Sequence, residues 1–258
     1  IFSFYAAVFY CCFQFRKDNA VIPKIIHQTW KSTEIPPRWQ RFRDAWKKFH
    51  PGWEFRLWTD EDNRRLVERD YTAFLQLYDS YAYPVQKADF ARILYLHKFG
   101  GVYADLDLEP LRPLDGIIDQ PHLILGEEKE GMGKSLNRCD FIINAFMASP
   151  KGHPFWEMLL ERLRVTFRHK RLLQSKGHYI IQTVIFELDK LARDYQQTHQ
   201  DITIYPYEVF YPLSWHEACS ELERSKAVEM SYTIHHFDTT WFSGGMMLMK
   251  KLRRRLNI

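Results

Sequence analysis

The run Gly100-Gly101-Val102-Tyr103-Ala104-Asp105-Leu106-Asp107 constrains this chain most, because a helix-breaking Gly-Gly pair leads into an apolar stretch that contains two acids. The stretch predicts a short strand, whose side chains alternate between two faces. One face would carry Tyr103, Asp105 and Asp107, and the core face Val102, Ala104 and Leu106. At about 3.3 Å of rise per residue, the two aspartate Cα atoms would lie roughly 6.6 Å apart. Such close like charges need a cation or donors to compensate them, which predicts a metal and phosphate site.

Length and charge exclude some classes of protein. At 258 residues, 46% of them hydrophobic, the chain can bury one sizeable core and lacks the composition of a disordered protein. It carries 36 basic and 32 acidic residues, for a net charge of +4. Seven of the basic residues lie near the two ends, namely Arg16, Lys17, Lys250, Lys251, Arg253, Arg254 and Arg255. The rest of the chain is slightly acidic, so a nucleic-acid partner is not expected.

The two ends of the chain differ in composition from the rest of the sequence. Residues 1–15 carry no charge and seven aromatics, which favours the remnant of an N-terminal membrane anchor or an interfacial segment; a buried strand or helix is the alternative. Residues 246–258 predict a basic amphipathic tail or a frayed end. We therefore expect a hydrophobic segment at 1–16, a catalytic domain at 20–245 and the tail. Cys139 and Cys219 are compatible with a disulfide or with free thiols.

The order of elements favours an α/β sheet. Strands are predicted at 22–30, 53–58, 102–107, 122–126, 141–147, 202–205 and 232–237, and helices at 38–49, 61–69, 85–99, 153–169 and 179–195. Thr59 or Asp60 is expected to cap the second helix, and Gly100 to end the third. Residues 126–133 predict a polar loop. The opening order of strand, helix, strand, helix is typical of α/β proteins.

Two further groups carry candidate chemistry. Asp89 and Arg92 are three residues apart on an apolar helix and share a face, as a local ion pair or as a sugar-binding pair. His235 and His236 close a predicted strand, as half-buried polar residues or as a source of an imidazole ligand for the aspartates. Trp30 and Trp241 are core aromatics or a platform for a base and a donor to phosphate.

Several motifs in order resemble glycosyltransferase family 32, which includes inositol-phosphoceramide mannosyltransferases and yeast Golgi mannosyltransferases. The motifs are Pro23-Lys24-Ile25-Ile26-His27-Gln28-Thr29-Trp30, Leu57-Trp58-Thr59-Asp60, Ala88-Asp89-Phe90-Ala91-Arg92, the run 100–107, and Asn144-Ala145-Phe146-Met147-Ala148-Ser149. The resemblance implies an α/β protein with a GT-A, Rossmann-like nucleotide-sugar-binding fold, in which helices flank a mixed central sheet. It covers residues 22 to about 245. Residues 178–183 stand where many mannosyl-transferring relatives carry a Thr-Gly-Pro turn, so the acceptor side is expected to differ.

The resemblance also implies roles for single residues. Asp107 would bind Mn2+ (or Mg2+) directly, and Asp105 would hold the metal or the ribose. Trp30 would stack on the base and Tyr103 would support the nucleotide. Asp89 and Arg92 would bind the transferred sugar. His235, in preference to His236, would bind the metal. Thr239 and Trp241 would lie near the diphosphate.

The resemblance predicts a retaining, metal-dependent glycosyltransferase. GDP-mannose is the first expected donor, and UDP-galactose or UDP-glucose the second. The expected acceptor is a hydroxyl of a glycolipid or glycan, with membrane association and a lumenal catalytic domain in the Golgi or endomembrane system. A phosphohydrolase with Asp105 as nucleophile and Asp107 as acid is one alternative. A non-catalytic sugar-binding subunit is the other, although Asp105, Asp107, Asp89, Arg92 and His235 are all present.

Overall fold

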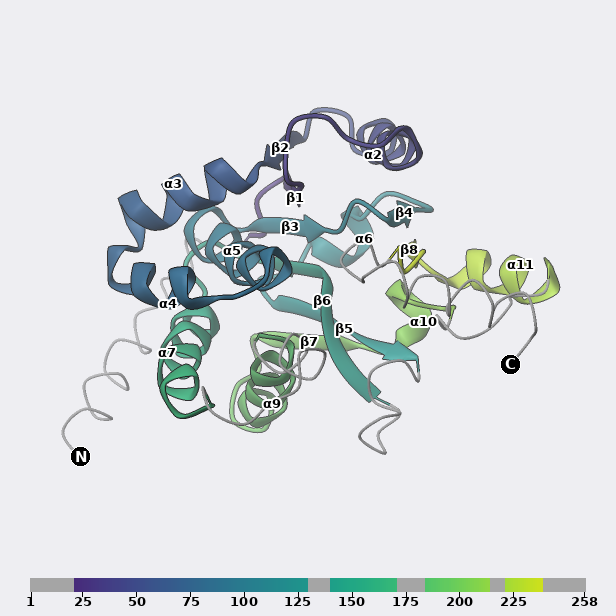
Figure 1. Cartoon of the computed structure of the whole chain (residues 1–258). Helices are drawn as coiled ribbons and strands as arrows, with labels where there is room; N and C mark the ends of the chain where they lie inside the picture. The colour runs from purple at the N-terminus through teal and green to yellow at the C-terminus, as the bar shows by residue number, and fades with distance from the viewer. Residues whose placement is uncertain (1–20, 130–139, 171–183, 214–220, 239–258) are drawn as a thin grey trace, which may run out of the picture.

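The computed structural model describes residues 21–129, 140–170, 184–213 and 221–238. Within these ranges one six-stranded sheet has the order β2-β1-β3-β6-β5-β7, and β4 and β8 form a separate two-stranded sheet (Figure 1). The strands are β1 (Ile25–Thr29), β2 (Glu54–Trp58), β3 (Gly101–Ala104), β4 (Leu108–Pro110), β5 (Leu123–Lys129), β6 (Asp140–Ser149), β7 (Ile202–Tyr205) and β8 (Thr233–His235). β1 runs parallel to β2 and β3, and β7 is parallel to β5. β6 is antiparallel to β3 and β5, so the predicted mixed sheet is confirmed.

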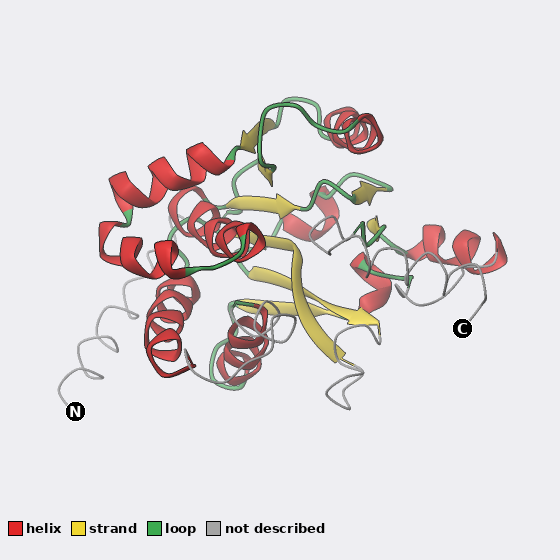
Figure 2. Cartoon of the chain, in the orientation of Figure 1, coloured by secondary structure: helices red, strands yellow, loops and turns green. Residues whose placement is uncertain are grey.

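Helices flank this sheet, as Figure 2 shows. They are α2 (Pro37–Phe49), α3 (Asp60–Asp70), the 3-10 helix η3 (Thr72–Phe74), α4 (Leu75–Ser80), α5 (Pro84–Phe99), α6 (Asp115–Ile118), α7 (Pro154–Lys170), α9 (Ile185–Gln196), α10 (Tyr207–Phe210) and α11 (Glu221–Met230). Thr59 caps α3, because its side chain accepts from the Asp62 N–H and the Asp62 carboxylate accepts in return. Gly100 ends α5 at a φ of 65°. Among the described helices, none combines the length and apolarity that a bilayer crossing requires.

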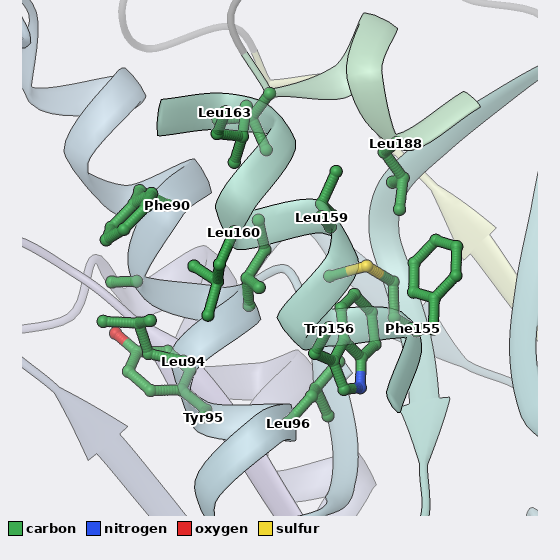
Figure 3. Close-up of a cluster of buried hydrophobic side chains, with 14 of the residues drawn as sticks. Phe90, Leu94, Tyr95, Leu96, Phe155, Trp156, Leu159, Leu160, Leu163 and Leu188 are labelled. Atoms are coloured by element: carbon green, nitrogen blue, oxygen red, sulfur yellow. The ribbon is translucent and has the colours of Figure 1, made fainter. Parts of the chain in front are cut away.

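The core has two layers, one on each face of the sheet. Neighbouring sheet residues alternate between them: Tyr103 and Met147 join the layer under α5, α7 and α9, whereas Val102 and Phe146 join the layer under α2, α6 and α10. Figure 3 shows the first layer, where aromatic and leucine side chains of α5 and α7 interdigitate, with Leu188 of α9 nearby. α5 is apolar on most of its surface, which explains why its middle lies inside the protein.

Two sequence predictions are wrong in detail. β3 ends at Ala104, and Asp105 to Asp107 form a tight turn, in which the Leu108 N–H donates to the Asp105 carbonyl at 3.0 Å. The Asp105 N–H still donates to the Ala145 carbonyl of β6 at 2.9 Å, and the strand ends because the chain turns directly after this bond, which Asp tolerates well. The expected loop at 126–133 begins too early, since Gly126 to Lys129 pair with β6. Residues 130–133 lie outside the described ranges.

The Gly-Gly break supports a close approach of two backbones. Gly101 has a φ of +94°, and a Cβ there would lie 2.6 Å from the Ile25 carbonyl oxygen of β1. Gly52 has a similar φ of +82°, but a Cβ there would meet nothing within 4 Å.

We predict that Gly101→Ala destabilises the protein more than Gly52→Ala. The left-handed backbone costs about 1–2 kcal/mol at either position, and the contact with Ile25 adds to that cost only at Gly101. Urea unfolding of the two variants and the wild type measures the difference. Equal losses in the two variants would contradict a tight approach between β1 and β3.

Candidate active site

Three potential metal ligands converge at one end of the sheet. Carboxylate oxygens of Asp105 and Asp107 and a ring nitrogen of His235 all lie within 4.8 Å of one another. The aspartates lie in the turn after β3, and β4 begins directly after them. β4 pairs antiparallel with β8, which places Leu108 opposite His235. The two-stranded sheet therefore places His235, which comes late in the sequence, next to the two aspartates.

The charges of this group are strongly coupled. Burial opposes ionisation of Asp107, but the His235 imidazole and the Asp238 backbone N–H lower its pKa to about 2. Burial raises the pKa of Asp105, with a further rise from Asp107, although Arg92 acts against it. Burial disfavours the charged form of His235, but Asp107 outweighs it and raises the histidine pKa. Added positive charge is therefore favourable at this point.

The donor set fits a hard divalent cation. Two carboxylates suit Mg2+ and Mn2+, and one imidazole is compatible with Mn2+. His235 is only 10% exposed, and its Nδ1 is buried without a hydrogen-bond partner among the described residues. A buried nitrogen in that state is costly unless a ligand supplies its missing partner. Asp105 and Asp107, with 25% and 13% of their side chains exposed, remain accessible.

The structure also decides between the two adjacent histidines. His235 Nε2 lies 3.4 Å from Asp107 Oδ1. His236 faces away: its Nε2 lies 2.7 Å from Glu109 Oε2, and its ring stacks on Phe42 of α2 at 4.7 Å. His235 is therefore the histidine that reaches the aspartates.

Asp89 and Arg92 form a buried network beside the aspartates. Arg92 Nη2 lies 3.1 Å from Asp89 Oδ1, and Arg92 Nη1 lies 3.3 Å from Asp105 Oδ1. Arg92 Nη1 also donates to the Asn144 carbonyl at 2.9 Å, and the Asn144 amide donates to Asp89 at 3.0 Å. Asp89 and Arg92 are 4% and 5% exposed. Asp89 and Arg92 thus form the local ion pair that was one of the two hypotheses from sequence. The same arginine also pairs with Asp105.

Two predicted nucleotide-binding residues differ in position. Tyr103 is fully buried, donates its hydroxyl to Asp105 at 2.6 Å and lies under the Arg92 guanidinium at 4.5 Å. Trp30 is half-buried and packs edge-on against Trp39 at 4.7 Å. Its indole Nε1 is buried and has no partner among the described residues. Tyr103 therefore contacts Asp105 from inside, whereas Trp30 has a free donor.

Some predictions fall outside the described residues. These are Thr239, Trp241, Cys139, Cys219, the segments 1–16 and 246–258, and the residues 178–183. The sequence analysis also missed contributors inside the described ranges, above all Asn144, Trp39 and Asp238. Asn144 had a signal, because it is a polar residue within the apolar run of β6. The sequence gives no signal for Trp39 and Asp238, because their contact joins segments that are far apart in the chain.

Comparison with known families agrees with this geometry. Residues 36–124 match the model of the glycosyltransferase sugar-binding region containing the DXD motif, and residues 148–250 match the alpha 1,4-glycosyltransferase conserved region. Two regions of the chain are thus similar to glycosyltransferase families, the first of them described by a DXD motif. The predicted resemblance is therefore confirmed, and the Asp105-Leu106-Asp107 sequence within the first matched region is a DXD motif.

Several curated proteins are similar to this chain in sequence. The chain is 31% identical over 245 residues to inositol phosphoceramide mannosyltransferase 3 of Schizosaccharomyces pombe, covering 89% of this chain and 64% of the relative. It is 36% identical over 141 residues to mannosyl phosphorylinositol ceramide synthase SUR1 of Saccharomyces cerevisiae, covering 53% and 37%. With the initiation-specific alpha-1,6-mannosyltransferase of Candida albicans it shares 28% identity over 188 residues, covering 70% and 46%. The chain spans less than two thirds of each of these relatives.

Solved structures confirm the fold. The ligand-free glycosyltransferase domain of the YGT toxin aligns with a TM-score of 0.52 at 10% identity, covering 91% of this chain and 86% of that one. PaToxG glycosyltransferase aligns with a TM-score of 0.50 at 15% identity, covering 75% and 78%. The predicted GT-A fold is thus confirmed.

We predict that Asp89 makes stability depend on pH. Burial raises its pKa from 3.8 to about 6, so the folded state binds this proton more tightly than the unfolded state. Its contribution to stability is therefore present at about pH 4 and falls by up to about 3 kcal/mol as the pH rises to about 6. Asp89→Asn removes this decline. Urea unfolding between pH 4 and 7 checks it, and parallel pH profiles of wild type and variant would contradict it.

Proposed function

We propose that this chain is a retaining, metal-dependent glycosyltransferase that moves a hexose from a nucleotide sugar to a hydroxyl of a glycolipid or glycan. The observation that carries the proposal is that the candidate cation ligands and the buried Asp89–Arg92 network share one residue. Asp105 belongs both to the cluster with Asp107 and His235 and, through Arg92, to the network with Asp89 and Asn144. One group is suited to a cation and diphosphate, and the adjacent group to sugar hydroxyls.

The chemistry follows from these residues. A bound Mn2+ or Mg2+ supplies positive charge that stabilises the departing nucleoside diphosphate. Asp105, Asp107 and His235 hold that charge in place, and Trp30 offers its ring to the base. Thr239 and Trp241 are proposed to approach the diphosphate. Tyr103 supports the nucleotide by fixing Asp105, to which its hydroxyl donates.

Asp89 and Arg92 are proposed to orient the transferred sugar. Their burial keeps water away from them, and the Asn144 amide fixes the Asp89 carboxylate. Asp89 already pairs with Arg92, which weakens it as a nucleophile. We therefore propose that the acceptor hydroxyl attacks the sugar from the same face as the departing nucleoside diphosphate. The departing phosphate then takes the proton of that hydroxyl. A glycosyl-enzyme trapped on a carboxylate of this site would contradict that course.

Mannose from GDP-mannose is the first proposed donor. Two of the relatives named above are mannosyltransferases by name, and the third is a mannosyl phosphorylinositol ceramide synthase. Two of the three names contain an inositol-phosphate ceramide, which favours a glycolipid acceptor. UDP-galactose or UDP-glucose is the second candidate, because the matched alpha 1,4-glycosyltransferase region specifies no mannose. We propose membrane association and a lumenal catalytic domain at 20–245 in the Golgi or endomembrane system, with the segments 1–16 and 246–258 on either side.

The first experiment is nucleotide release from a panel of GDP- and UDP-sugars with Mn2+, with and without a glycolipid acceptor. Release from one donor that EDTA abolishes supports the proposal. Binding without turnover under every acceptor condition would instead support a sugar-binding subunit. A phosphoenzyme on Asp105 would support a phosphohydrolase.

We predict that Asp107→Asn lowers kcat/KM for the active donor at least about 100-fold, since it removes an anionic ligand of the cation whose positive charge would stabilise the transition state. Glu109→Gln is the matched control, because it removes a carboxylate from β4 that lies outside the cation cluster. The control is expected to keep most of the activity. Equal losses in both variants, measured by nucleotide release, would contradict the assigned role of Asp107.

A further inference from the structure

We propose that Trp39 and Asp238 are positioning residues of the cation site that act through Asp107. The inference rests on the proposed function only in taking Asp107 as a cation ligand. Within the described part of the chain, Trp39 makes no hydrogen bond to either aspartate of the DXD motif, so its effect must pass through another residue. That residue is Asp238, which follows β8 in the sequence.

The side chain of Asp238 is held by α2. Trp39 donates its indole N–H to Asp238 Oδ2 at 3.0 Å, and Arg38 Nη1 lies 3.1 Å from the same oxygen. Trp39 is only 5% exposed, and 18% of the Asp238 side chain is exposed. The anchor is therefore largely shielded from water, where a charge-assisted hydrogen bond is strong.

The backbone of Asp238 in turn holds Asp107. The Asp238 N–H donates to Asp107 Oδ2 at 2.7 Å, while Asp107 Oδ1 faces His235 Nε2 at 3.4 Å. One carboxylate oxygen is thus used to fix the rotation of the group, and the other is directed toward the proposed cation. A donor that hydrogen-bonds to a carboxylate ligand orients that carboxylate and tunes its affinity for the metal.

The chain between His235 and Asp238 needs such an anchor. Phe237 has a φ of +51°, the one positive φ of a non-glycine residue among the described positions. Non-glycine residues rarely adopt this conformation unless the surroundings impose it. α2 supplies two such contacts, Trp39 on Asp238 and Phe42 stacked on His236. The turn that aims the Asp238 N–H therefore depends on a helix from the start of the chain.

The matched control is another buried tryptophan. Trp156 of α7 is fully buried and donates its indole N–H to the Ser149 hydroxyl at 2.9 Å. Trp39→Phe and Trp156→Phe therefore each remove one hydrogen bond donated by a buried indole N–H, to a carboxylate in the first variant and to a hydroxyl in the second. Both changes can lower the unfolding midpoint, but only the first is expected to affect the cation site.

The test is a Mn2+ titration of the full chain followed by electron paramagnetic resonance, with GDP or UDP at a fixed concentration. We expect Trp39→Phe to weaken Mn2+ binding about tenfold, and Trp156→Phe to bind within about twofold of wild type. Asp238→Ala is the second variant, because it keeps the backbone N–H but loses both side-chain anchors. It is expected to weaken Mn2+ binding at least as much as Trp39→Phe.

The outcomes separate the inference from the proposed function. Wild-type Mn2+ affinity in both Trp39→Phe and Asp238→Ala would overturn the positioning role. A loss of similar size in Trp156→Phe would overturn it as well, since stability alone would then explain the change. If Asp107→Asn also binds Mn2+ as the wild type does, or the wild type shows no saturable binding, the proposed cation site itself is contradicted.

Discussion

The guanidinium of Arg92 holds the two halves of the candidate site together. It lies within 3.3 Å of carboxylates from α5 and from the turn after β3, and it donates to a backbone carbonyl of β6. Burial disfavours its charge, yet the surrounding acids, Asp105 first among them, raise its pKa above the ordinary value. Breaking a buried pair of this kind typically costs about 3–5 kcal/mol, because an uncompensated charge remains. The acids Asp89 and Asp105 can therefore be buried near each other only while Arg92 is present.

β6 makes this arrangement possible because its register shifts near the site. Its end from Phe146 to Ser149 pairs with β3, and its pairing with β5 shifts between Leu125 and Gly126. In the irregular stretch the carbonyls of Asn144 and Ala145 accept from Arg92 and from the Asp105 N–H. The Tyr211 hydroxyl accepts from the Phe146 N–H at 2.7 Å. Backbone groups that leave the ladder are thus satisfied by the site and its support.

Much of this could be predicted from sequence, since it depends on local patterns. Thr59 and Gly100 marked helix ends through capping chemistry, and the Gly-Gly break located the aspartate motif. The exact path of Asp105 to Asp107 could not be predicted, because the position of the turn after β3 depends on pairing with β6, a strand far away in the sequence. The strand β4 was missed for the same reason, since three residues become a strand only by pairing with β8. Asn144 and Asp238 acquire their roles from contacts between segments far apart in the chain.

The central claim is that Asp105, Asp107 and His235 bind one divalent cation together with a nucleoside diphosphate. Anomalous diffraction at the manganese edge, from crystals grown with MnCl2 and GDP or UDP, tests it most directly. The account predicts a single strong peak within coordination distance of both carboxylates and the imidazole, with the diphosphate on its open side. A peak elsewhere, or a diphosphate bound away from these three residues, would contradict the account.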